Sequence, residues 1–203
     1  MGLFRKTRRR IRQRLYFTPE KMLQRLHRFH DLMSQTPLAD KYWICGGMVI
    51  GYAREGKLLA HDTDFDFHYW REDHQDLMAA ITTLEQAGFR KEACWINNEG
   101  HATEYVLNYG HIKFEFFEAT RHEDRIRWYC YLPRPKRQFL NEIPGFDLEP
   151  VNFCDRQWLK PANEQQYLES VYGDWQTPCH DYTYYIDSKA IIQRDRWKGT
   201  NQW

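Results

Sequence analysis

The chain has 203 residues, of which 42% are hydrophobic and 16% aromatic. That much apolar surface suffices for one folded domain and excludes a chain that is disordered throughout. No apolar run approaches the roughly 20 residues that a membrane-spanning helix needs. The five cysteines are widely spaced and never form a CxxC pair. This usage favours free thiols in a reducing, cytoplasmic environment over a disulfide framework or a zinc knuckle.

Basic charge is concentrated at the start of the chain. Residues 1–16 contain seven of the 29 Lys and Arg residues and no acid, so the other 22 basic residues face 28 acidic ones. This arm lacks the apolar stretch of a secretory signal. The more specific interpretation of this arm is that residues 2–16 contact an anionic membrane and hold the protein peripherally at the inner face of that membrane. A solvated leader is the plainer alternative, and nucleic-acid binding is not expected.

Hydrophobic periodicity and turn residues predict the first elements. Thr18 and Pro19 form a helix start, and apolar residues then recur at helical spacing. Gly56 and Gly88 are expected to end helices. The predicted order is a helix over 19–34, a strand over 42–45, a helix over 48–54, a strand over 58–69 and a helix over 76–87.

The residues that follow are rich in aromatic and branched side chains, which are typical of strands. We expect an antiparallel meander that continues the sheet, with strands over 89–96, 103–109, 112–118 and 126–132. Residues 133–155 contain four prolines and are predicted to be irregular. A last helix is predicted over 161–172, and the pattern of residues 182–203 predicts no particular role.

Three carboxylates alternate within the predicted strand over 58–69, at Asp62, Asp64 and Asp66. Alternate side chains of a strand point to one face. Their mutual repulsion makes this array costly for stability alone, and a hard divalent cation between them would relieve it. A solvated edge strand and a calcium-stabilised loop are the plainer alternatives. We take the aspartates as the core of a candidate active site.

Gly46 and Gly47 lie between a predicted strand and a predicted helix. Glycine lets a phosphate approach the backbone closely, and a helix N-terminus offers free N–H groups and a positive dipole end. Two glycines alone also suit an ordinary tight turn. The aspartates fifteen to twenty residues later favour a phosphate site.

Glu115 lies among hydrophobic residues in the predicted strand over 112–118. Burying an unpaired carboxylate is costly, so this side chain needs a partner. A salt bridge and the metal site are both open explanations. The aspartates upstream favour the metal site.

Two segments together resemble a known family. The first, GGMVIGYAREGKLLAHDTDFDF, spans residues 46–67 and places Gly51 and Arg54 in the helix between the glycine pair and the aspartates. It resembles the signature of LicD-type phosphotransferases, the group that includes fukutin and fukutin-related protein. The second, PANEQQYLESVYGDWQTP at residues 161–178, resembles the C-terminal helix of that family, which ends in Tyr-Gly-Asp.

The resemblance implies an α+β fold, a nucleotidyltransferase-like mixed β-sheet flanked by helices in a single domain. It places a catalytic domain over residues 18–180, with the basic arm over 1–17 and a tail over 181–203 packed on the same domain. Family members transfer a substituted phosphate, of the phosphocholine, ribitol phosphate or glycerol phosphate type, from a CDP-activated donor to a sugar hydroxyl. We therefore expect a transferase that acts on a cell-surface glycan or its precursor.

The resemblance also implies roles for individual residues. Asp64 and Asp66 are expected to hold one or two Mg²⁺ ions, with Mn²⁺ as the alternative metal. Glu115 is expected to complete this metal and catalytic set and to act as general base toward the acceptor hydroxyl. The residues expected to bind phosphate and substrate are Gly46, Gly47, Arg54 and Asp62.

Two other functions stay open at this point. One is a nucleotidyltransferase that moves a nucleoside monophosphate from a nucleoside triphosphate to a small hydroxylated acceptor. The Tyr-Gly-Asp segment argues against it. The other is a non-catalytic scaffold docked on a membrane. The intact carboxylates argue against that function, because a protein without the activity has no need to bear their repulsion.

Overall fold

The computed structural model describes residues 17–60, 62–179 and 181–203. The basic arm that we expect to contact a membrane lies outside these residues, and its function stays a prediction. Within the described ranges, no helix is long and apolar enough to span a membrane. The helices are α2 (Pro19–Met33), α3 (Gly46–Glu55), η1 (Arg71–Asp73), α4 (His74–Gln86), α5 (Glu164–Tyr172) and α6 (Tyr184–Asp187).

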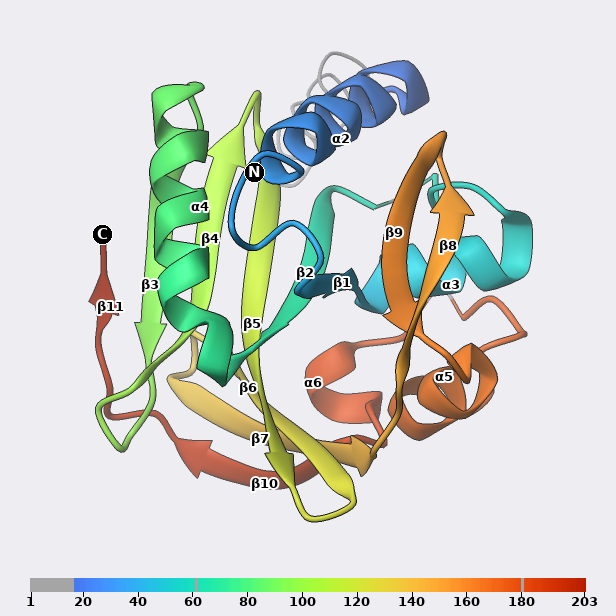
Figure 1. The fold of residues 1–203 in the computed structure, drawn as a ribbon. Coiled ribbons are helices and arrows are strands. Elements are labelled where there is room, and N and C mark those ends of the chain that lie inside the picture. The colour runs from blue at the N-terminus through green and yellow to red at the C-terminus, as the bar shows by residue number, and fades with distance from the viewer. Residues whose placement is uncertain (1–16, 61, 180) are drawn as a thin grey trace, which may run out of the picture.

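One mixed sheet organises the fold (Figure 1). Its central path runs β10-β7-β6-β5-β4-β3-β11, with β2 attached to β5 and β1 attached to β2. A separate two-stranded ribbon is formed by β8 and β9. The strands are β1 (Tyr42–Ile44), β2 (Asp64–Trp70), β3 (Arg90–Ile96), β4 (Ala102–Tyr109), β5 (Ile112–His122), β6 (Arg125–Leu132), β7 (Arg137–Pro144), β8 (Leu148–Phe153), β9 (Arg156–Pro161), β10 (Ile191–Arg196) and β11 (Asn201–Gln202).

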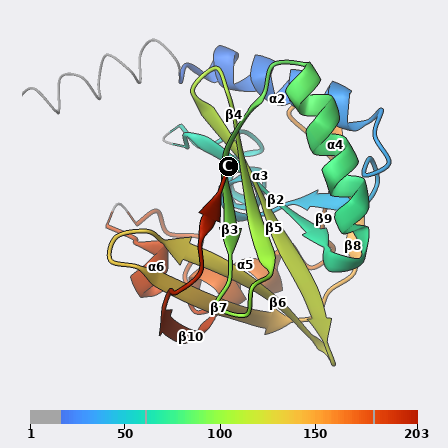
Figure 2. The ribbon, with the colours of Figure 1, turned by 90° about the vertical axis from the view of Figure 1, so that its left-hand side faces the viewer.

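The long strand β5 has two different neighbours along one edge. Residues 113–119 pair with β2 in parallel, and residues 119–122 pair with β6 in antiparallel. The sheet therefore divides at β5, and β6, β7 and β10 curl away beneath β2 and β4 (Figures 1 and 2). This curl creates room for a cavity next to β2. The expected meander from β3 to β6 is confirmed as antiparallel, and β7 extends it.

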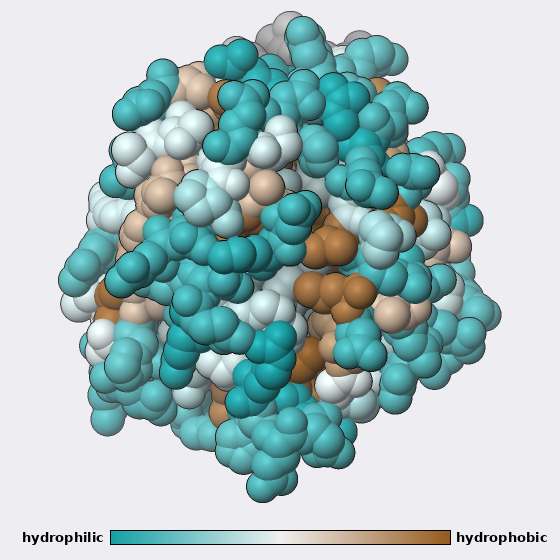
Figure 3. All heavy atoms as spheres, in the orientation of Figure 1, coloured by the Kyte–Doolittle hydropathy of each residue, from teal (hydrophilic) through white to brown (hydrophobic). Residues whose placement is uncertain are grey.

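Aromatic packing fixes α2 against the sheet. Phe29 of α2 is fully buried and stacks on Phe67 of β2 and Phe114 of β5, with ring centroids 4.8 and 4.7 Å apart. Burying such rings stabilises the fold through both their apolar area and their stacking geometry. Helices α2 and α4 cover this side of the sheet, and the cavity lies on the other side (Figures 1 and 2). The molecular surface seen in Figure 3 is mostly hydrophilic, with a few hydrophobic residues near its centre.

Two predictions of local structure are wrong. The strand predicted over 58–69 begins only at Asp64, so Asp62 lies in the preceding loop. Residues 133–155, predicted to be irregular, contain β7 and β8. Prolines are tolerated at strand ends and on edge strands, where no ladder hydrogen bond is lost. Pro144 is the last residue of β7, and Pro150 lies in the two-stranded ribbon.

Candidate active site

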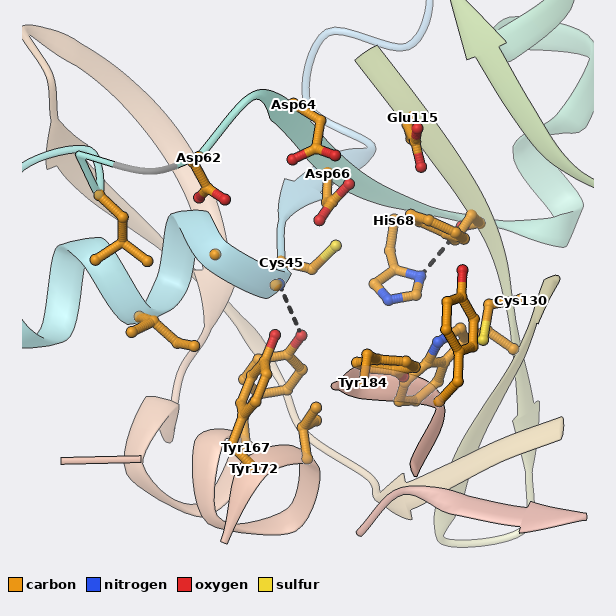
Figure 4. Close-up of a pocket in the computed structure, with 18 of the residues that line it drawn as sticks. Cys45, Asp62, Asp64, Asp66, His68, Glu115, Cys130, Tyr167, Tyr172 and Tyr184 are labelled. Atoms are coloured by element: carbon orange, nitrogen blue, oxygen red, sulfur yellow. Dashed lines mark hydrogen bonds between the residues drawn. The ribbon is translucent and has the colours of Figure 1, made fainter. Parts of the chain in front are cut away.

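A cavity of about 440 Å³ lies between β2 and the C-terminal helices. Asp62, Asp64 and Asp66 line it together with Glu115, and Figure 4 shows the three aspartates along one side of it. Asp66 is the direct neighbour of Glu115 across the parallel pair of β2 and β5, where Lys113 faces Asp64. The structure therefore brings the four predicted carboxylates to one cavity, although Asp62 reaches it from a loop.

The carboxylates raise one another's pKa. Burial raises the pKa of Asp66 well above its usual range, and the charges of Asp64 and Glu115 add to this effect. Burial and the neighbouring Asp64 raise the pKa of Asp62 to about 7. Burial also raises the pKa of Glu115, which Lys113 opposes from 3.2 Å. An array of this kind is destabilising unless positive charge enters the cavity.

The glycine pair lets the aspartates pack against the backbone of α3. Gly46 has a φ of +57°, and a Cβ there would lie 2.7 Å from Oδ2 of Asp66. A Cβ at Gly47 would lie 2.1 Å from Oδ2 of Asp62. A side chain at either position would therefore displace an aspartate carboxylate. The glycine pair leaves room for two carboxylates at the N-terminus of α3, where the helix dipole favours negative charge.

Tyr167 of α5 connects this turn to the C-terminal part of the chain. Its hydroxyl accepts a hydrogen bond from the Gly46 N–H at 3.2 Å (Figure 4). This bond joins residues 121 positions apart in the chain. It brings the motif at residues 161–178 into contact with the motif at residues 46–67. This contact fixes the orientation of the first turn of α3.

We expect Tyr167→Phe to lower the free energy of unfolding by about 1 kcal/mol, because the Gly46 N–H loses its acceptor. Chemical denaturation monitored by circular dichroism measures this change. Tyr129→Phe is the matched control, because its hydroxyl makes only a long 3.4 Å bond to exposed Glu99. Equal losses in the two variants would contradict the role given to Tyr167.

Arg54 is not among the residues that line the cavity. Its Nη2 donates to the carbonyl oxygen of Trp175, and the carbonyl oxygen of Thr177 lies 3.5 Å from the same atom. Arg54 therefore joins α3 to the segment that follows α5. Its contact with a phosphate stays a prediction.

Tyrosines form the wall of the cavity opposite the aspartates. They come from α5 and from the tail around α6, and Asn141 of β7 holds one of them by accepting from the Tyr184 hydroxyl at 2.8 Å. Sequence reasoning missed this wall, although Tyr167 and Tyr172 belong to the quoted second motif. Among the residues that it missed in the cavity are His68, Glu104, Phe117, Trp128, Cys130, Tyr167, Tyr172, Tyr182, Tyr184 and Tyr185.

The carboxylate oxygens at the cavity are ligands of the kind that a hard divalent metal prefers. Mg²⁺ and Mn²⁺ prefer carboxylate oxygens, and Asp64, Asp66 and Glu115 offer these at one cavity. Among the residues that the structure describes, no three His, Cys, Asp or Glu side chains are gathered closely enough to hold an ion as they stand. The chemistry of these residues fits a metal, and a bound ion would draw their oxygens together.

The curled mixed sheet and the acidic cavity define a nucleotidyltransferase-like transferase. The chain belongs to the LicD/FKTN/FKRP nucleotidyltransferase domain family, whose model matches residues 40–163. This confirms the resemblance and shows that the protein is a transferase domain of that family. Family membership implies transfer of a phosphate-containing group.

Two solved structures of the antibiotic-resistance factor ANT(2'')-Ia are similar to this chain at 15% sequence identity. The crystal structure in complex with adenylyl-2''-tobramycin has a TM-score of 0.49 and covers 80% of this chain and 81% of that one. The solution structure has a TM-score of 0.50 and covers 82% and 78%. At this identity the second likeness confirms the fold and nothing further. No curated protein sequence matches the chain.

Proposed function

We propose that this protein transfers a substituted phosphate from a CDP-activated alcohol to a hydroxyl of a sugar or glycan. The proposal rests on one observation: Asp64, Asp66 and Glu115 line the same cavity as the glycine turn. The carboxylates supply the oxygen ligands that a cation needs in phosphate transfer, and the glycines leave room for these carboxylates beside α3.

Asp64, Asp66 and Glu115 would hold Mg²⁺ or Mn²⁺. When bound, the metal would neutralise charge on the diphosphate of the donor. The residues of the chain would position the reactants. Gly46 and Gly47 would leave room for Asp66 and Asp62 at the N-terminus of α3, and Asp62 would contact the substrate beside Gly47. Glu115 would also accept the proton of the acceptor hydroxyl as general base.

The test is to identify the product released from the donor. With Mg²⁺ and a sugar acceptor, we expect CMP from at least one of CDP-choline, CDP-ribitol and CDP-glycerol, measured by anion-exchange chromatography. Omitting the metal should stop the release. Pyrophosphate released from a nucleoside triphosphate, with no CMP from any of the three donors, would instead establish nucleotidyl transfer.

A further inference from the structure

One buried carboxylate in the cavity has no part in the function proposed above. Glu104 of β4 is 6% exposed and lines the cavity. It is paired in register with Phe117 of β5, so it lies on the same sheet face as Glu115. Its Oε2 is fully buried and has no hydrogen-bond partner among the described residues. A buried oxygen without a partner is costly, which indicates that something else supplies the bond.

The charges around Glu104 indicate that the missing hydrogen-bond partner of Oε2 is positively charged. Burial and the charge of Glu115 both raise the pKa of Glu104, and Lys113 is the cation that opposes them. Lys113 already contacts Glu115 at 3.2 Å. Lys113 and the proposed metal both lie at Glu115, so Glu104 itself lacks a paired cation among the described residues. A neutral hydroxyl would satisfy Oε2 but would leave the charge of Glu104 unpaired.

The surroundings of Glu104 also suit a cation. Phe117 is its register partner on β5, and the charge of Glu104 adds to burial in raising the pKa of Tyr185. Trp128 and Tyr184 line the same cavity. Aromatic faces attract cations, most strongly where water is excluded. A quaternary ammonium would supply charge without an N–H donor and would leave Oε2 unpaired. A protonated amine supplies both.

We propose that Glu104 and the aromatic side chains beside it form a subsite for a protonated amine carried by one of the two substrates. The inference rests on the proposed function, because it places the subsite in the same cavity as the transfer. The amine belongs either to the activated alcohol of the donor or to an amino sugar that serves as acceptor. These two sources share one chemistry and differ in which reactant carries it.

The test compares matched probes by isothermal titration calorimetry, with the full chain and Mg²⁺. CDP-ethanolamine is compared with CDP-glycerol for the donor, and glucosamine with glucose for the acceptor. We expect the amine-bearing member of at least one pair to bind about tenfold or more tightly, as a buried charge-assisted hydrogen bond allows. CDP-ethanolamine should also bind more tightly than CDP-choline if the donor carries the amine.

Glu104→Gln should remove the preference, because it keeps the shape of the side chain and removes its charge. Glu85→Gln is the matched control, since Glu85 is an exposed residue of α4 paired with Lys91. This variant should keep the preference. Thermal unfolding of both variants shows that each is folded.

Four results would overturn the inference: equal affinities within both pairs, a preference that survives Glu104→Gln, equal weakening of neutral and amine-bearing probes, or loss of Mg²⁺ affinity in Glu104→Gln. The last would place Glu104 in the metal site. Calorimetry reports binding without turnover. A preference without CMP release would therefore refute the proposed function alone, and CMP release without a preference would refute the subsite alone.

Discussion

Replacing Asp66 by Asn is expected to stabilise the metal-free protein at neutral pH by about 1–3 kcal/mol, because Asn needs neither a buried charge beside two other carboxylates nor proton uptake on folding. Asp66 lies next to Glu115 across the β2–β5 pair, and both Asp64 and Glu115 raise its pKa. The same change should lower the rate of CMP release roughly a hundred- to a thousandfold, as losses of groups that stabilise transition-state charge do. Stability and activity should therefore move in opposite directions.

Chemical denaturation in EDTA measures the stability, and CMP release in Mg²⁺ measures the activity. Asp147→Asn is the control, because Asp147 is exposed and does not line the cavity. It should change neither quantity appreciably. A less stable Asp66→Asn protein in EDTA would show that Asp66 is held by favourable contacts and would contradict the proposed repulsion.

Gly46→Ala should lower turnover at least tenfold, whereas Gly56→Ala should leave it near that of the wild type. Both glycines have a positive φ, +57° and +64°, so alanine costs about 1–2 kcal/mol of backbone strain at each. Of these two glycines, only Gly46 places the new Cβ against a proposed catalytic group, Oδ2 of Asp66 at 2.7 Å. Nothing lies within 4 Å of a Cβ at Gly56. Small displacements of a catalytic group reduce rates strongly.

The two glycine variants are compared by thermal unfolding and by CMP release. Similar losses of stability with very different rates would separate displacement of Asp66 from strain of the backbone. Equal rates would mean that Asp66 tolerates the displacement, and the glycine pair would then have no more than a conformational role.

The central part of the site could be predicted from the sequence, because its information is local. Alternation places Asp64 and Asp66 on one face of β2 whatever the rest of the chain does. Glu115 was predictable because a carboxylate among hydrophobic residues needs a partner, and the structure provides both Lys113 and the cavity. The quoted motif supplied the fold and the class of enzyme, which the family match confirms.

The tyrosine wall and Glu104 could not be predicted, because their positions depend on pairing between distant segments. Tyr184 reaches the cavity through Asn141 of β7, within a region whose prolines suggested irregular structure. Glu104 belongs to an ordinary strand pattern, and only its register opposite Phe117 places it beside Glu115. Short-range patterns do not contain such information.

The bond from Gly46 to Tyr167 has a consequence for the order in which the molecule forms. It joins residues 121 positions apart, and the bond from Tyr184 to Asn141 closes the cavity still later in the chain. During synthesis the ribosome releases α2, β1 and β2 long before α5 and α6 exist. We therefore expect the aspartates to stay hydrated until the last helices arrive, so that the repulsion between them sets in only after most of the sheet can form. Contacts between residues so far apart in the chain slow folding. Early folding intermediates then do not yet bear the repulsion between the buried aspartates.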